Sequence, residues 1–156
     1  MMKMNHKLKE RGESMLEASH IKTGVKVATW KEAIKEAGQI LVEAHSCTVE
    51  YIHAMIAAVE ELGPYIVMTP HVALAHARPS PQVNQADMSL VVLDEAIEFG
   101  SVANDPVKLV FAFCAVDNES HLGLLGKLAK ILNPETINRL REVKVASEAI
   151  KILGGA

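Results

Sequence analysis

The segment from Val107 to Val116 constrains the fold of this chain more than any other part of the sequence. It is apolar at every position except Lys108, so both of its faces can be buried. A strand buried on both faces is typical of the middle of a sheet that helices cover on each side. No apolar stretch approaches the roughly 18 residues that a membrane-spanning helix needs. We therefore predict a central β-strand over residues 107–116.

Segments with apolar residues at helical spacing are expected to cover this strand. Thr29 precedes such a segment and has Glu32 three positions later, which is a capping-box pattern at a helix start. Gly and Pro residues mark the ends of several segments. The expected helices are capped by Thr29, Thr48 and Asn118 and end near Ala44, Leu62 and Leu132, with shorter ones at Ile137–Leu140 and at Ala146–Leu153 before Gly154-Gly155.

Shorter runs supply the remaining strands. Residues 21–28 alternate apolar and polar side chains, which is typical of a half-buried strand. Residues 65–68 are rich in β-formers and bounded by prolines, so we expect a buried strand there, and residues 88–93 predict another. Residues 79–86 are expected to form a loop. Because helices and strands alternate irregularly, the sequence predicts one α/β domain with a mixed β-sheet flanked by α-helices.

The composition excludes several classes of protein. With 156 residues, of which 22% are charged and 49% hydrophobic, the chain suits one domain with a sizeable core. A formal net charge of -3, with no basic cluster beyond the N-terminus, argues against a nucleic-acid binder. Cys47 and Cys114 lack metal or redox spacing, which fits a reducing compartment. We expect a cytoplasmic protein in which residues 1–20 form a frayed or briefly helical leader and residues 21–156 form the domain.

His76 is the leading candidate for chemistry. It ends a largely apolar run and is followed by Arg78 and Pro79. An imidazole can act as a nucleophile, and a guanidinium is the side chain best shaped to hold a phosphate. The segment closely follows a predicted strand, where functional residues of α/β sheets usually lie. The alternative is a loop histidine whose neighbours pack for structural reasons.

His121 is the second candidate. Counted from Asn118, it falls in the first turn of its helix, where exposed amides and the helix dipole favour an anion. It also lies beyond the central strand, so His76 and His121 could meet at one edge of the sheet. The alternative, favoured by spacing alone, is a solvent-exposed histidine at a helix start. The histidines expected on polar faces or in the tail are His6, His20, His45 and His53.

A metal site is a weaker alternative. It would combine His71, His76 and His121 with Cys114 or Asp117. Metal ligands are usually announced by close paired spacing, such as two histidines one helical turn apart, and the segment from His71 to His76 is not expected to be helical. The chain also lacks a nucleophile-elbow serine and a Gly-rich phosphate loop, which argues against a serine hydrolase and against ATP as phosphate donor.

These residues resemble a known family. The active-site signature of IIA components of the bacterial phosphoenolpyruvate-dependent sugar phosphotransferase system is similar to Gly63-Pro64-Tyr65-Ile66-Val67 followed by Ala73-Leu74-Ala75-His76-Ala77-Arg78-Pro79. The similarity is to the mannitol/fructose superfamily and is closest to its ascorbate-type branch. Further agreement comes from Phe99-Gly100, Asn104-Asp105-Pro106-Val107 and Ser120-His121-Leu122. The resemblance runs from about residue 20 to the end of the chain.

The resemblance implies a phosphocarrier with the mannitol/fructose-type IIA fold. The histidine aligned with His76 takes a phosphoryl group from the histidine-containing phosphocarrier protein and passes it to a cysteine of a IIB component, which serves a membrane IIC permease. A neutral His76 is expected to attack, while His121, Arg78 and helix-start amides hold the phosphoryl oxygens. No metal or nucleotide cofactor is implied, and a homodimer is common. The alternative is a regulatory IIA-like module that controls a non-transport partner.

The resemblance leaves the sugar open, with ascorbate and pentitol-like compounds as candidates. Where this chain has Ala75 the family usually has Pro, and where it has His71 the family commonly has Gly. Ala75 relaxes the backbone before the nucleophile, and the His71 imidazole could crowd or assist the site. Because a carrier must present its phosphate to two proteins in turn, we expect a shallow depression with an apolar rim. The expected rim residues are Val72, Leu74 and Pro79.

Overall fold

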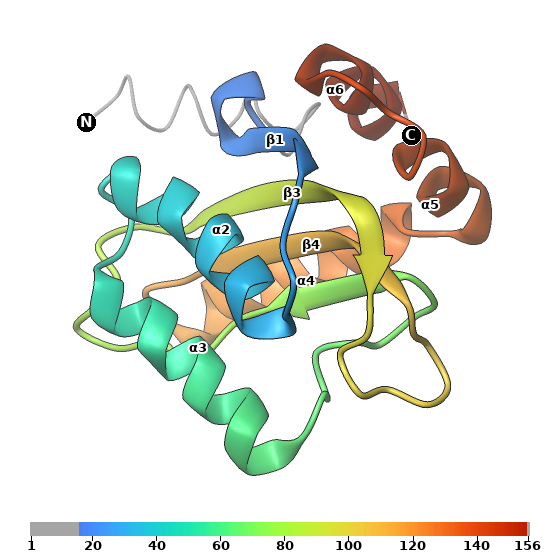
Figure 1. Ribbon diagram of the computed structural model, residues 1–156. Helices are drawn as coiled ribbons and strands as arrows, with labels where there is room; N and C mark the ends of the chain where they lie inside the picture. The colour runs from blue at the N-terminus through green and yellow to red at the C-terminus, as the bar shows by residue number, and fades with distance from the viewer. Residues whose placement is uncertain (1–15, 156) are drawn as a thin grey trace.

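The computed structural model describes residues 16–155 and places a mixed four-stranded sheet between two layers of helices (Figure 1). In chain order the elements are η1 (Ala18–His20), β1 (Ile21–Val25), α2 (Trp30–Glu43), α3 (Val49–Leu62), β2 (Val72–Ala75), β3 (Asp87–Ile97), β4 (Val107–Cys114), α4 (Asn118–Ile131), α5 (Pro134–Leu140) and α6 (Ala146–Gly155). The strand order is β1-β3-β4-β2, and only the β3–β4 pair is antiparallel. The predicted fold class is therefore confirmed.

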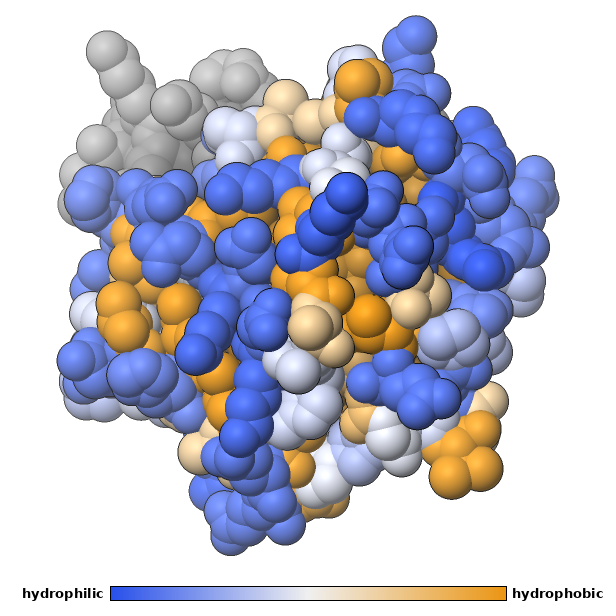
Figure 2. All heavy atoms as spheres, in the orientation of Figure 1, coloured by the Kyte–Doolittle hydropathy of each residue, from blue (hydrophilic) through white to orange (hydrophobic). Residues whose placement is uncertain are grey.

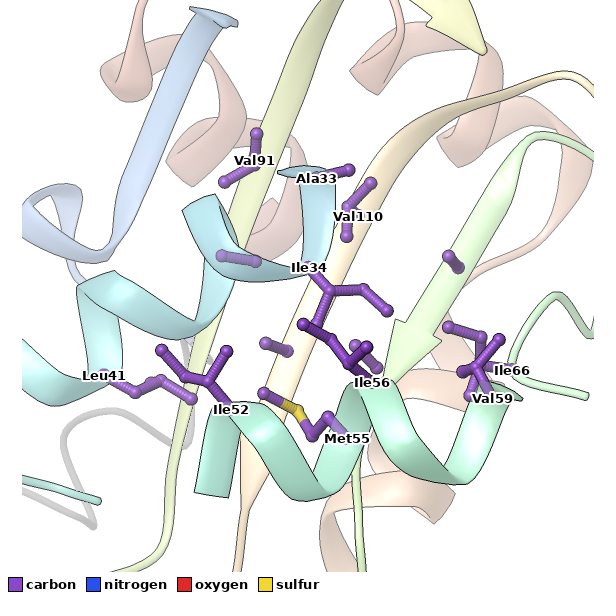
Figure 3. Close-up of a cluster of buried hydrophobic side chains, with 14 of the residues drawn as sticks. Ala33, Ile34, Leu41, Ile52, Met55, Ile56, Val59, Ile66, Val91 and Val110 are labelled. Atoms are coloured by element: carbon purple, nitrogen blue, oxygen red, sulfur yellow. The ribbon is translucent and has the colours of Figure 1, made fainter. Parts of the chain in front are cut away.

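Strand β4 confirms the predicted central strand, although it ends at Cys114. It pairs with β3 on one side and β2 on the other, and its side chains alternate between two cores. One core lies under α2 and α3 and includes Val110 and Ala112 (Figure 3). The other lies under α4, α5 and α6 and includes Phe111 and Phe113. Burial on both faces explains why this run is apolar at every position except the half-buried Lys108.

Helix α2 has the N-cap that its capping-box pattern predicts, Thr29, while Glu32 bonds one residue before the cap. The Thr29 hydroxyl accepts from the Glu32 N–H at 3.3 Å, and the Glu32 carboxylate accepts from the Ala28 N–H at 3.2 Å. Further along, Gly38 lets α3 approach, because a Cβ there would lie 2.7 Å from Cγ1 of Ile52. The outward faces of α2 and α3 are largely hydrophilic in Figure 2. The amphipathic pattern therefore predicts this layer correctly.

The predicted strand over residues 65–68 is wrong. These residues form a turn after α3, held by bonds from the Tyr65 N–H to the Gly63 carbonyl and from the Val67 N–H to the Pro64 carbonyl. The strand lies further on, in β2, whose residues pair with 109–112 of β4. Ile66 and Val67 are nevertheless buried. Their apolar character reflects packing of a turn and not membership of the sheet.

Several element boundaries also differ from prediction. Thr48 occupies the N-cap position of α3, but its hydroxyl donates to Gln82 Oε1 at 2.6 Å and makes no cap bond. Asp117, and not Asn118, caps α4 by accepting from the Ser120 N–H at 2.8 Å. Helix α5 begins earlier than expected, at Pro134. Helix α6 continues through the two glycines expected to end it, while β1 is shorter and β3 longer than predicted.

Residues 1–15 of the expected leader lie outside the described residues, and the remainder packs on the sheet. Leu16 is buried, and so is His20, which corrects the expectation that His20 lies on a polar face or in the tail. The His20 Nδ1 lies 3.3 Å from Oδ1 of Asp87, and the Ser46 hydroxyl donates to Oδ2 at 2.6 Å. Burial would raise the pKa of Asp87, but bonds from His20 and Ser46 and the His20 charge lower it overall.

His45 and His53 are exposed, as expected. Between residues 16 and 155, none of the helices combines the length and apolar character that crossing a membrane requires.

Candidate functional site

His76 directly follows β2 and lies against the end of β4. Its ring stacks on Phe113 with centroids 4.9 Å apart and an interplanar angle of 16°. Parallel pairing sets Ala75 opposite Ala112, so β2 and β4 end at the same edge of the sheet. Ala75 is fully buried, and its pairing with β4 holds the backbone that leads into His76. The sheet register therefore brings His76 over Phe113.

His121 meets His76 at this edge. Their ring centroids are 5.2 Å apart at 72°, and His121 also contacts Phe113 edge-on, with centroids 5.3 Å apart at 64°. The predicted meeting of the two histidines is confirmed, and His121 is half-buried against two rings. Because Asp117 is the N-cap, the N–H of His121 is already bonded to the Asp117 carbonyl at 3.1 Å. Any contact of His121 with an anion must therefore come from its imidazole.

The tautomer of His76 follows from its contact with the main chain. Its Nδ1 lies 2.7 Å from the carbonyl oxygen of Leu74. A carbonyl oxygen can only accept, so Nδ1 carries the proton and Nε2 keeps its lone pair when the ring is neutral. Burial lowers the pKa of His76, the Leu74 carbonyl opposes this, and His121 adds to the lowering. The site thus favours a neutral imidazole with Nε2 as the nucleophilic atom.

Tyr65 and Tyr51 complete the surroundings of His76, although neither is predicted to take part. The Tyr65 ring meets the imidazole edge-on at 5.5 Å, and its hydroxyl donates to the His76 carbonyl at 3.3 Å. The buried Tyr51 hydroxyl accepts from the Ala77 N–H at 3.0 Å and lies 2.9 Å from the Phe113 carbonyl. The one available signal is that a tyrosine on the buried face of a helix needs a partner for its hydroxyl.

Arg78 is exposed. Among residues 16–155 it makes no hydrogen bond or ion pair with another side chain or with the backbone. It lies two positions after His76, and its guanidinium is open to an incoming anion. Its role as an anion anchor stays a prediction.

The predicted apolar rim is wrong for two of its three members. Val72 and Leu74 are 0% and 6% exposed, because they belong to β2 and pack into the core under α4, α5 and α6. The exposed apolar side chains near the histidines are different ones. They are Tyr65, which contacts His76, Val116, which precedes the α4 cap, and Leu122, which follows His121.

His71 lies at the opposite end of β2 from His76, so it neither crowds nor assists the site. Its Nδ1 is 2.9 Å from the Pro106 carbonyl oxygen, and its φ of 73° lies in the left-handed region that favours glycine. Cys114 packs in the core under α2 and α3. Within the described part of the chain, no group of three or more His, Cys, Asp or Glu residues could hold a metal. The ligand set of the metal alternative does not converge.

Comparisons with known proteins match this chain over nearly its whole length. The family model described as "Phosphoenolpyruvate-dependent sugar phosphotransferase system, EIIA 2" matches residues 14–155. The ascorbate-specific PTS system EIIA component of Escherichia coli (strain K12) is 32% identical over 143 residues, covering 90% of this chain and 93% of the relative. These matches confirm the resemblance in the sequence.

Solved structures agree with these matches. The complex of mannitol enzyme IIA with phosphorylated mannitol enzyme IIB from Escherichia coli aligns with a TM-score of 0.81 and 28% identity, over 90% of this chain and 98% of that chain. The nitrogen regulatory protein IIA-Ntr from Neisseria meningitidis aligns with a TM-score of 0.77 and 28% identity, over 90% and 97%. The fold is therefore shared by an enzyme IIA that forms a complex with a phosphorylated enzyme IIB and by a protein named as a nitrogen regulator.

Proposed function

This chain belongs to the EIIA 2 family of the phosphoenolpyruvate-dependent sugar phosphotransferase system, and we propose that it carries the phosphoryl group on Nε2 of His76. Components of this family pass phosphate to a IIB component during sugar uptake. The observation that supports the proposal is the 2.7 Å contact between Nδ1 of His76 and the Leu74 carbonyl. It leaves Nε2 as the free nitrogen of a neutral ring beside His121.

The chemistry of the transfer needs positioning and charge stabilisation more than covalent machinery. The lone pair of Nε2 attacks the donor's phosphorus, and the donor's P–N bond breaks with its electron pair left on the donor ring. The Nδ1–H bond to Leu74 disperses the positive charge that develops on the His76 ring. In the second step a cysteine thiolate attacks the phosphorus, and the pair of the broken bond returns to Nε2.

The phosphoryl oxygens would be held by groups around the start of α4. The His121 imidazole is one, and the N–H groups of Asn118 and Glu119 are others, since they have no partner among the described residues. They stand at the positive end of the helix dipole, which favours an anion. Arg78, two positions after His76, would add an exposed guanidinium to these groups.

The partners are proposed from the family. The donor would be the histidine-containing phosphocarrier protein, and the acceptor would be a cysteine of the cognate IIB component. That component serves a membrane permease, and the transfers would take place in the cytoplasm. The exposed Tyr65, Val116 and Leu122 would contact both partners in turn. Because the curated relative is ascorbate-specific, we favour ascorbate over a pentitol-like sugar. A homodimer stays a prediction.

The test is labelling with phosphoenolpyruvate, enzyme I and the phosphocarrier protein. The parent chain is expected to form an acid-labile adduct whose ³¹P signal is that of Nε2-phosphohistidine. His76→Ala should form none. Labelling of His76→Ala to the parent's extent, or an Nδ1 adduct in the parent, would show that the assignment of the carrier atom is wrong.

A regulatory role is the second candidate, because a protein named as a nitrogen regulator shares this fold. The two roles differ in where the phosphate goes. A transport component passes it to the cysteine of an ascorbate-type IIB protein, and we expect that transfer here. A labelled chain that keeps its phosphate in the presence of IIB proteins of the ascorbate and mannitol types would instead support the regulatory role.

A further inference from the structure

The peptide group between His76 and Ala77 is bound at both of its ends by tyrosine hydroxyls. Tyr65 donates to its carbonyl oxygen at 3.3 Å, and Tyr51 accepts from its N–H at 3.0 Å. The Tyr51 hydroxyl also lies 2.9 Å from the Phe113 carbonyl oxygen and 3.1 Å from the Ala77 carbonyl oxygen, and its one hydrogen is shared between these two acceptors. The same main-chain unit is therefore tied to the α3 region from two directions and to the end of β4.

The two tyrosines hold this peptide group from different environments. Tyr51 is 1% exposed and packs with the core side chains of α2 and α3, so its ring cannot move without disturbing that core. Burial raises the pKa of Tyr51, so its hydroxyl stays protonated and can donate a hydrogen bond at neutral pH. Tyr65 is 37% exposed and lies in the turn after α3.

Holding this peptide group also sets the direction of the His76 side chain. Pairing of β2 with β4 fixes the residues before His76, up to Ala75 opposite Ala112. The tyrosines fix the peptide group that follows it. With the main chain held on both sides, the Cα–Cβ bond of His76 has one direction, which allows the ring to lie on Phe113 and its Nδ1–H to reach Leu74.

We propose that Tyr51 and Tyr65 are positioning residues for phosphoryl transfer, which hold the His76–Ala77 peptide group so that Nδ1 of His76 stays protonated and Nε2 faces the donor. The proposal rests on the proposed function of His76. Both hydroxyls bond to the main chain of His76 and Ala77, and they act on the His76 ring through it. Their hydroxyls, and not their rings, are the groups that matter for this role.

The experiment compares the full-length parent with Tyr51→Phe, Tyr65→Phe and the double variant. ¹⁵N NMR of the His76 imidazole reports its tautomer, and single-turnover labelling is measured with the phosphorylated phosphocarrier protein and with phosphoramidate. The parent should show one neutral tautomer with Nδ1 protonated. Tyr51→Phe should show a mixture and slow both labelling reactions by about 10-fold, since small misplacements of a reacting group can cost up to about 10²-fold. Tyr65→Phe should act in the same direction with a smaller effect.

Phosphoramidate separates positioning from docking, because it has no protein surface to bind. Thr23→Val is the matched control. It removes the Thr23 hydroxyl, which donates to the Lys144 carbonyl at 2.9 Å. Thr23 lies in β1, at the opposite edge of the sheet from β2. It should leave both the tautomer and the labelling rates unchanged, which shows that loss of a hydroxyl-to-carbonyl bond elsewhere is not enough.

The outcomes separate this proposal from the proposed function. If His76→Ala is still labelled, the carrier assignment fails, while the tautomer measurement still decides the role of the tyrosines. If Tyr51→Phe and Tyr65→Phe keep the parent's tautomer and rates, the positioning role is wrong. Should Tyr51→Phe not fold, Tyr65→Phe decides alone, because its partly exposed ring can lose a hydroxyl without leaving a buried gap.

Discussion

The two ends of β2 carry a histidine each, and they make different use of the same side chain. His71 precedes the strand and His76 follows it, and both place Nδ1 against a main-chain carbonyl, at 2.9 Å from Pro106 and 2.7 Å from Leu74. His76 also stacks on Phe113 and contacts His121. Among the described residues, His71 has no such ring contact. A hydrogen bond at Nδ1 is therefore common to both histidines. What distinguishes His76 as a candidate functional residue is the set of aromatic rings around its imidazole.

The largest expected difference between the two ends is in labelling. His76→Ala should abolish phosphorylation by the phosphocarrier protein, whereas His71→Ala should be labelled as fast as the parent. His71 is separated from the site by the length of β2, so its loss leaves Phe113 and His121 in place. The measurement is incorporation of labelled phosphate from phosphoenolpyruvate. A slow His71→Ala variant with normal stability would show that the two ends are coupled.

His121 should account for the next largest difference. His121→Ala removes a group that contacts the His76 ring, and loss of one preorganised donor typically slows transfer on the order of 10²-fold. The label should stay on His76, as ³¹P NMR of the product would show. Phe113, which contacts both rings, remains in this variant, so the stacking of His76 is preserved. An unchanged rate would mean that His121 only packs beside the nucleophile.

Substitutions at Arg78 test whether its exposed guanidinium also binds the phosphoryl group. Arg78→Lys keeps the charge but cannot reproduce the planar two-pronged hydrogen bonding of a guanidinium. Loss of one hydrogen bond is worth about 1 kcal/mol, so transfer should slow about fivefold. Arg78→Ala should be slower still. Equal rates for the Arg, Lys and Ala proteins would remove Arg78 from the site, leaving the start of α4 as its sole anion-binding group.

The pH dependence of labelling should reflect the burial of His76. A histidine with the usual pKa of about 6.5 loses roughly two thirds of its neutral form between pH 7 and pH 6. Burial lowers the pKa of His76, so its nucleophilic neutral form should persist further into acid and the rate should fall less over this interval. Labelling by phosphoramidate across this range, with NMR titration of the His76 ring, measures it. A titration of His76 above the usual pKa would contradict the structure.

Local sequence patterns predict correctly those elements that have a clear signature, either a continuous apolar run or a capping residue followed by apolar residues at helical spacing. The run in β4 and the capping box of α2 are of this kind, and both are confirmed. The strand expected over 65–68 fails because Ile66 and Val67 are buried by a turn, and propensity does not distinguish burial in a turn from burial in a sheet. The meeting of the histidines is predicted because each follows a predicted strand, although the strand that leads into His76 is β2 and not residues 65–68. The parallel pairing of β2 with β4, which brings the two histidines to one edge, comes from the structure.

Local sequence patterns cannot predict the contacts that the two tyrosines make with the main chain at His76. Tyr51 is 26 positions from Ala77 and 62 from Phe113, and its bonds to them depend on how α3 lies across β2 and β4. Sequence spacing carries no information on contacts of that range without the sheet register. For the same reason Val72 and Leu74 look like rim residues in sequence and are core residues in the structure.

The smallest expected effect is a change in the free energy of unfolding caused by substitutions at His71, which should leave phosphoryl transfer unchanged. The φ of 73° at His71 is in the left-handed region, which costs a residue with a Cβ about 1 kcal/mol more than glycine. His71→Gly and His71→Ala both lose the bond to the Pro106 carbonyl, so their difference isolates the backbone term. In urea unfolding, His71→Gly should be more stable than His71→Ala by about 1 kcal/mol, and both should be labelled as fast as the parent.

Equal stability of the two variants would mean that the main chain at the start of β2 leaves the left-handed region once the imidazole is gone. The bond from His71 to the Pro106 carbonyl would then be what holds the parent chain in that region. The His71 end would then resemble the His76 end after all, since hydrogen bonds from side chains would fix the main chain at both.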